Sequence, residues 1–137
     1  MAPKTVLVLV DIAHRDSGEA VLRYAAATFP ESTLHVAYVM PYGFYSYVEP
    51  FVSDDSQKAA NARAKAELAE LVAASGATAV PHVLRGGIGE QSLLEAKALK
   101  ADLIVLNAAR PGSTLSTLGT HAAQIARHAE ASVLLHR

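Results

Sequence analysis

The stretch Thr5-Val6-Leu7-Val8-Leu9-Val10 is a continuous apolar run, rich in β-branched side chains and ended by Asp11. A short continuous run, rather than an alternating one, is typical of a strand covered on both faces of a parallel sheet. The run is too short to span a membrane. The N-terminus also lacks the apolar length and the small-residue cleavage site of a signal peptide. We therefore expect a cytoplasmic protein whose first element is a buried strand.

Four more apolar runs of similar length follow along the chain. They are Thr33–Val39, Ala79–Leu84, Leu103–Leu106 and Ser132–Leu135. Between the runs, apolar residues recur at the three-to-four-residue spacing of helices. The helical stretches are marked by Leu22, Ala25, Ala26 and Phe29; by Ala64, Leu68, Leu71 and Val72; by a segment from about Glu90 to Lys100; and by Ala122, Ile125, Ala126 and Ala129. This alternation predicts an α/β fold with a parallel sheet and helices on both faces.

Residues that favour helix ends agree with this order. Asp16 and Ser17 are predicted to cap the first helix. Asp54-Asp55-Ser56 leads into the second helix and places acidic side chains at its positive end. Gly76 is expected to end that helix.

The composition excludes several classes of protein. The chain has 137 residues, and we expect residues 1–137 to form a single domain. Hydrophobic residues make up 51% and charged residues 18%, which excludes disorder as the main state. The net charge of −1 argues against a nucleic-acid-binding protein, which needs clustered positive charge to bind phosphates. The absence of cysteine excludes disulfide frameworks, thiolate zinc sites and thiol catalysis.

Two connections are unusually long, and loops of this length are more often functional than idle. The first runs from Met40 to about Asp55 and is rich in aromatic residues. It would serve either as a lid or as a surface for a protein partner, because aromatics are enriched in interface cores. The second runs from Asn107 to Leu118 and is rich in serine and threonine.

Ligands of an open parallel sheet bind beyond the carboxyl ends of the strands, where the strand order reverses. Segments expected at this edge are Asp11, Val39-Met40, Gly86-Gly87-Ile88-Gly89 and Asn107. Gly119-Thr120, followed by His121, then opens the last helix.

The pair Gly119-Thr120 is the most informative of these candidates. The free backbone amides at a helix start form an anion site, and glycine lets a phosphate approach them closely. The Thr120 hydroxyl can donate one further hydrogen bond to such a phosphate. An ordinary capped helix start remains the alternative. Asp11 is suited either to a ribose or adenine amino group or to capping a turn. The Gly86-Gly87-Ile88-Gly89 run is suited either to a ligand or to a tight turn.

Other kinds of site are not indicated. The six histidines include no pair at the i, i+4 spacing of a helical metal site, and His121 and His128 are seven residues apart. Neither a GxSxG elbow nor a GxxxxGK[ST] loop is present. No general base stands beside a nucleophile, and no set of carboxylates for Mg²⁺ is evident. We therefore expect a binding protein rather than an enzyme.

Over essentially the whole chain, these segments resemble the universal stress protein (UspA-like) family. Residues 6–11 resemble the family's first strand with its terminal aspartate. The last helix and strand are similar in sequence and order, which is fairly specific. The matching segments are Val6–Asp11, Ser17–Ala25, Leu34–Pro41, Ala101–Leu106, Gly119–Ala129 and Ser132–Leu135.

The resemblance implies a doubly wound, Rossmann-like sheet of five strands in the order 3-2-1-4-5. It also implies a homodimer in which the final strand, Ser132 to His136, pairs with its own copy. Some members of the family bind ATP or AMP, and others bind no nucleotide. By the same resemblance, Asp11 and Val39 match positions that contact adenosine. Gly119 and Thr120 match positions that contact phosphate.

Nucleotide-binding members of the family carry G-x-x-G, nine further residues and then G-[ST]. Asn107 and Arg110 stand where the first two glycines would be, and eight residues separate Arg110 from Gly119. The side chains of Asn107 and Arg110 could crowd a triphosphate. Alternatively, Gly112 supplies local freedom and Arg110 supplies charge to a phosphate.

Two functions are therefore predicted from different features. The first is a dimeric stress or metabolic sensor that binds ATP or AMP, with or without Mg²⁺. The second is a nucleotide-free dimer that acts through protein contacts, with the Met40–Asp55 loop as the surface for its partner. Neither nucleic acid nor a membrane is expected as a partner.

Overall fold

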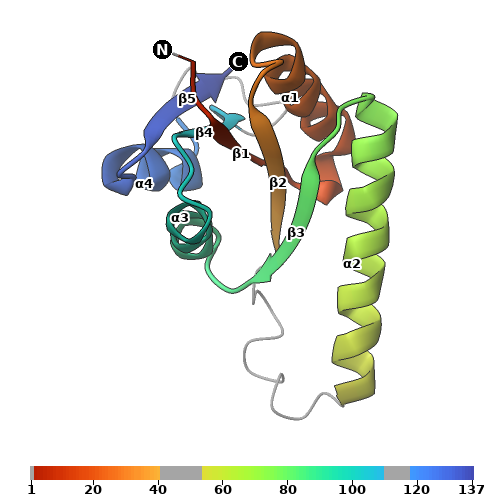
Figure 1. The fold of residues 1–137 in the computed structure, drawn as a ribbon. Helices are drawn as coiled ribbons and strands as arrows, with labels where there is room; N and C mark the ends of the chain where they lie inside the picture. The colour runs from red at the N-terminus through yellow and green to blue at the C-terminus, as the bar shows by residue number, and fades with distance from the viewer. Residues whose placement is uncertain (1, 41–53, 110–117) are drawn as a thin grey trace.

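The computed structural model describes residues 2–40, 54–109 and 118–137, and it contains one sheet of five parallel strands (Figure 1). The strands lie in the order β3-β2-β1-β4-β5. They are β1 (Thr5–Leu9), β2 (Thr33–Met40), β3 (Val80–Arg85), β4 (Leu103–Asn107) and β5 (Ser132–His136). The predicted fold class and strand order are confirmed, and each strand end lies within a residue or so of its predicted place.

Helices cover both faces of the sheet. They are α1 (Arg15–Thr28), α2 (Asp54–Ser75), α3 (Ile88–Ala98) and α4 (Thr120–His128), and a short 3₁₀ helix (Ile12–His14) precedes α1. Figure 1 shows α1 and α2 on one side of the sheet and α3 and α4 on the other. Within the described ranges, no helix combines the length and the apolarity that crossing a bilayer requires.

The start of α1 differs from the prediction. Asp16 and Ser17 lie inside the first turn of the helix and do not precede it. The capping side chain is Asp11, whose Oδ1 accepts a hydrogen bond of 2.9 Å from the Ala13 amide and so begins the 3₁₀ helix. The prediction was wrong because this 3₁₀ turn runs directly into α1 and moves the capping position upstream. Ser17 Oγ instead donates to His14 O at 3.0 Å.

The end of α2 follows the prediction. Gly76 comes directly after the helix and has φ +75°, the left-handed conformation that glycine adopts without strain. The preceding hydroxyl, Ser75 Oγ, donates to Val72 O at 2.7 Å and accepts from the Ala77 amide at 3.1 Å. These bonds satisfy backbone groups that the end of the helix leaves unpaired.

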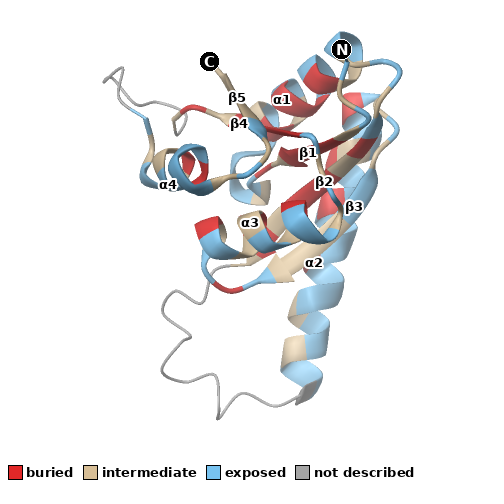
Figure 2. Cartoon of the chain, turned by 60° about the vertical axis from the view of Figure 1, so that its left-hand side comes forward, coloured by how far each residue is buried: buried red, intermediate tan, exposed pale blue. Residues whose placement is uncertain are grey.

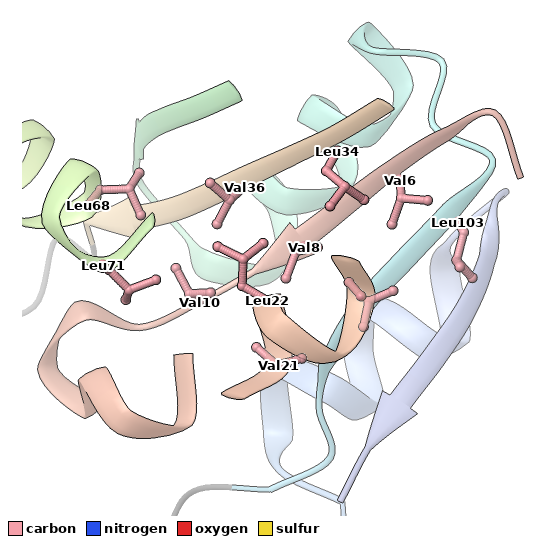
Figure 3. Packing of buried hydrophobic residues seen from close by; sticks show 12 residues of the cluster. Val6, Val8, Val10, Val21, Leu22, Leu34, Val36, Leu68, Leu71 and Leu103 are labelled. Atoms are coloured by element: carbon pink, nitrogen blue, oxygen red, sulfur yellow. The ribbon is translucent and has the colours of Figure 1, made fainter. Parts of the chain in front are cut away.

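Two hydrophobic cores explain why the first apolar run is continuous. Val6, Val8 and Val10 pack with α1 and α2 on one face, in the cluster drawn in Figure 3. Leu7 packs with α3 and α4 on the other face. Because side chains alternate between the faces of a strand, a strand buried on both sides must be apolar at every position. Figure 2 shows this burial along the central strands.

Candidate functional site

A cleft of about 990 Å³ opens at the carboxyl ends of β1 and β4. These strands are neighbours, but the chain leaves β1 toward α1 on one face and leaves β4 toward α4 on the other (Figure 1). The divergence creates the crevice that open α/β sheets use for ligands. The volume is in the range of sites for small molecules.

Most of the residues predicted for the site line this cleft. They are Asp11, Val39, Asn107, Gly119, Thr120 and His121. Met40 and Gly86 are not in the lining; they lie where β2 and β3 end, and Met40 O accepts a hydrogen bond of 3.0 Å from the Gly86 amide. Arg110, Gly112 and the segment 41–53 of the aromatic loop lie outside the described residues.

Gly86 has a structural reason to be glycine. Its φ is +132°, which L side chains rarely adopt, and a Cβ there would lie 3.1 Å from Gln91 Cγ. The residue forms the turn between β3 and α3. These observations fit the tight-turn interpretation of the Gly86-Gly87-Ile88-Gly89 run.

Gly119 has no such structural reason. Its backbone is extended, with φ −63° and ψ 156°, and a Cβ there would come no closer than 3.7 Å to an atom of the described residues. Gly119 is the N-cap of α4, and its carbonyl accepts from the Ala123 amide at 2.9 Å. The described residues therefore leave room for a Cβ at Gly119, and this room lies beside the cleft that Gly119 lines.

The first amides of α4 are donors without acceptors inside the helix. The Gly119 amide bonds to Ala108 O at 2.8 Å, and intrahelical bonding begins with Ala123. The amides of Thr120, His121 and Ala122 lie between these two, at the positive end of the helix dipole. All three residues line the cleft, so this end of the cleft is suited to a negatively charged group.

His121 adds an unpaired polar atom to the same region. Its Nδ1 is buried and has no hydrogen-bond partner among the described residues. Buried polar atoms in native proteins are usually hydrogen-bonded. His121 directly follows Thr120, whose side chain is exposed and carries a hydroxyl group.

Asn107 connects three elements beside the cleft. Its Nδ2 donates to Ser17 O of α1 at 3.3 Å, and its Oδ1 lies 3.3 Å from His136 Nδ1 of β5. The His136 ring in turn lies against Tyr24, with centroids 4.7 Å apart and planes tilted by 43°. Asn107 thus cross-links α1, β4 and β5.

Four further polar residues line the cleft, although the sequence patterns did not indicate them as site residues. They are His14, Ser17, Tyr38 and Ser92. Tyr38 precedes Val39 at the end of β2, so its position relative to the strand end was a usable signal. Burial, followed by the negative charges of Asp11 and Glu67, raises the pKa of Tyr38 above its ordinary value. Ser92 gave no such signal, because only the packing of α3 on the sheet brings it to the cleft.

Comparison with known proteins shows the same architecture over the whole chain. A universal stress protein solved in complex with cAMP is 25% identical, with a TM-score of 0.69 and coverage of 100% of this chain and 98% of that one. Hypothetical protein MJ0577 is 17% identical, with a TM-score of 0.77 and coverage of 96% and 94%. UspA from Lactobacillus plantarum is 21% identical, with a TM-score of 0.71 and coverage of 100% and 99%.

The family model described as the universal stress protein family matches residues 3–137. That match extends from before β1 to the last residue of the chain. The chain belongs to the universal stress protein family.

Proposed function

We propose that this protein is a dimeric sensor module that binds an adenine nucleotide in the cleft between β1 and β4. The observation that carries the proposal is the N-terminus of α4 inside the cleft, with a glycine cap that no contact with a described residue requires. A role in binding would account for that glycine, because no described residue fills the space that it leaves.

The lining fits the two ends of a nucleotide. Its phosphate would bind the amides of Thr120 and His121 and the Thr120 hydroxyl, where the helix dipole favours an anion. Its nucleoside would lie toward Asp11, which can accept hydrogen bonds from ribose hydroxyls, and against the buried apolar surface of Val39. The universal stress protein solved with cAMP supports the same class of ligand.

The charges of the described lining residues favour a ligand with few phosphates. Among the described lining residues, the ionisable side chains are Asp11, Tyr38 and two histidines, with no lysine or arginine. One helix N-terminus matches one phosphate group better than the several negative charges of a triphosphate. Asp11 is also the single carboxylate among these lining residues, so Mg²⁺ would enter mainly as a companion of the phosphates. We infer that AMP binds at least as well as ATP.

The edge strand β5 supports the homodimer. The His136 carbonyl accepts from the Ala108 amide at 2.8 Å, so even-numbered residues of β5 bond to β4. The backbone groups of Val133 and Leu135 then face the open edge and are available to a second copy. At the opposite edge, Gly86 bonds to β2, so odd-numbered positions of β3 face outward and Pro81 supplies no amide there.

Calorimetric titration with AMP, cAMP and ATP, each with and without Mg²⁺, tests the proposed ligand. Gly119→Ala is expected to weaken binding at least about 10-fold, because the methyl group occupies the space beside the free amides. Gly87→Ala is the matched control. Gly87 is also a glycine N-cap with extended backbone, its Cβ would come no closer than 3.8 Å to a neighbour, and it is not in the lining.

Equal binding by both alanine variants would contradict the proposed site. The absence of saturable heat with every nucleotide would contradict the proposed ligand. A second candidate, the nucleotide-free dimer acting through protein contacts, would then remain. Asn107 favours this candidate, because its side-chain amide already makes hydrogen bonds with Ser17 and His136. Truncation of Tyr45 and Tyr47, in the Met40–Asp55 loop, would then test whether this loop binds a protein partner.

A further inference from the structure

A chain of three titratable side chains connects β2, β3 and α3 at the side of the sheet that α3 covers. His35 Nδ1 lies 2.9 Å from His82 Nε2, and His82 Nδ1 lies 3.3 Å from Glu95 Oε1. The two rings are 5.1 Å apart between centroids and tilted by 32°. The side chains of His82 and Glu95 are 22% and 19% exposed.

This arrangement is a relay rather than a metal site. His82 uses both of its ring nitrogens within the chain, so the three groups do not converge on a common point. The described part of the protein contains no group of three side chains that could hold a metal ion. These three side chains can instead bind and exchange protons.

Together, the side chains of His35, His82 and Glu95 can accept one proton without losing a hydrogen bond. When both rings are neutral, His82 Nδ1 donates to Glu95, and His82 Nε2 accepts from His35 Nδ1. When His82 is protonated, it pairs with the Glu95 carboxylate, and its Nε2 donates to His35, which changes tautomer. A second proton makes both His35 Nδ1 and His82 Nε2 donors. Two imidazolium rings then face one another across a gap that no hydrogen bond spans.

Among the described residues, no charged group near His35 other than Glu95 offsets the second proton. From β1, the residue beside His35 in register is the apolar Leu7, and from β3 the facing group is His82. From α3 the facing group is Glu95, while helical geometry turns Glu90 and Lys97 to other sides. Burial, and secondarily the charge of His82, lowers the pKa of His35, while Glu95 acts in the opposite direction.

We propose that His35, His82 and Glu95 form a proton-operated clamp, which holds α3 on the β2–β3 side of the sheet near neutral pH and releases it when the two rings take up a second proton. The helix that it holds also contributes Ile88 and Ser92 to the wall of the cleft. Acidification would therefore loosen one wall of the cleft, whichever ligand occupies it.

The test is an NMR pH titration of the ligand-free protein between about pH 7.5 and about pH 5, with amide exchange measured at both ends. The ring signals of His35 and His82 are expected to shift together in coupled steps, as interacting sites do. Amides of α3 should lose at least about 10-fold in protection relative to amides of β1, after correction for intrinsic exchange. Independent titration of the two rings, with unchanged protection of α3, would overturn the proposal.

Two variants separate the clamp from a general effect of acid. His35→Gln keeps a side chain that can donate to or accept from His82 but does not titrate, so α3 should stay protected at about pH 5. His128→Gln removes an exposed histidine of α4 and should leave the response of α3 unchanged. A His35→Gln protein that loses protection of α3 as the natural protein does would contradict the clamp. Should that variant not fold, the titration of the natural protein decides alone.

Discussion

His136 Nδ1 lies 3.3 Å from Asn107 Oδ1, which joins the last residue of β5 to the last residue of β4 beside the cleft. Asn107 Nδ2 donates to a carbonyl of α1, so its Oδ1 must be the acceptor and His136 Nδ1–H the donor. The edge strand, the proposed site of dimerisation, is therefore connected to the cleft through one amide side chain.

Asn107→Ala should destabilise the protein by about 1–3 kcal/mol, because it removes two hydrogen bonds and leaves the Ser17 carbonyl and His136 without these partners. Thermal unfolding would show a fall in Tm of a few degrees. Asn107→Asp retains an acceptor for His136 but sets a carboxylate against the Ser17 carbonyl, so it should also destabilise at neutral pH. A stable Asn107→Ala protein would mean that the cross-link contributes little.

Two buried glycines should respond in opposite ways to replacement by alanine. A Cβ at Gly18 would lie 2.9 Å from Leu71 Cδ1, in the fully buried core between α1 and α2. Gly18→Ala should therefore cost about 1–3 kcal/mol through overpacking. A Cβ at Gly89 would meet the side chain of Gln124, which is exposed and can swing aside. Gly89→Ala should gain about 0.5–1 kcal/mol from helix propensity. Urea unfolding of both variants measures the contrast, and equal shifts of the same sign would contradict it.

Stability should fall as the pH falls below about 6.5, the ordinary pKa of histidine. The pKa of His35 is lowered in the folded protein, so in this window the unfolded chain binds more protons and the free energy of unfolding decreases with acidification. The loss is complete once the pH is below the folded pKa of His35. Urea unfolding at about pH 7.5 and about pH 5 should show this loss, and His35→Phe should reduce it. An unchanged pH dependence in His35→Phe would assign the loss to other groups.

The sequence was sufficient to predict the sheet, because strands buried on both faces leave continuous apolar runs such as residues 5–10. It also located Gly76 and the start of α4, where single residues decide a helix end. It misplaced the cap of α1, because Asp11 acts through a 3₁₀ turn that continues into the helix. Local patterns do not distinguish such a turn from a loop followed by a capped helix.

The relation of the site residues to one another was harder to predict. The sequence places Asn107 at the end of a strand, but its partners are Ser17 and His136, which lie far from it along the chain. His35 and His82 meet only because β2 and β3 pair in a register that sets them close together. Long-range hydrogen bonds of this kind depend on strand register and helix packing, which one sequence without its structure does not fix.

Leu135→Pro should dissociate the proposed dimer and leave the fold intact. Odd-numbered residues of β5 direct their backbone groups to the open edge, so the proline removes an amide that β4 does not use. Analytical ultracentrifugation should show a dimer for the natural protein and a monomer for the variant. Leu134→Pro, one residue away, removes an inward amide and should instead destabilise the fold. β3 already carries Pro81 at an outward position, which makes β5 the more open edge for pairing. A Leu135→Pro protein that remains dimeric would place the interface elsewhere.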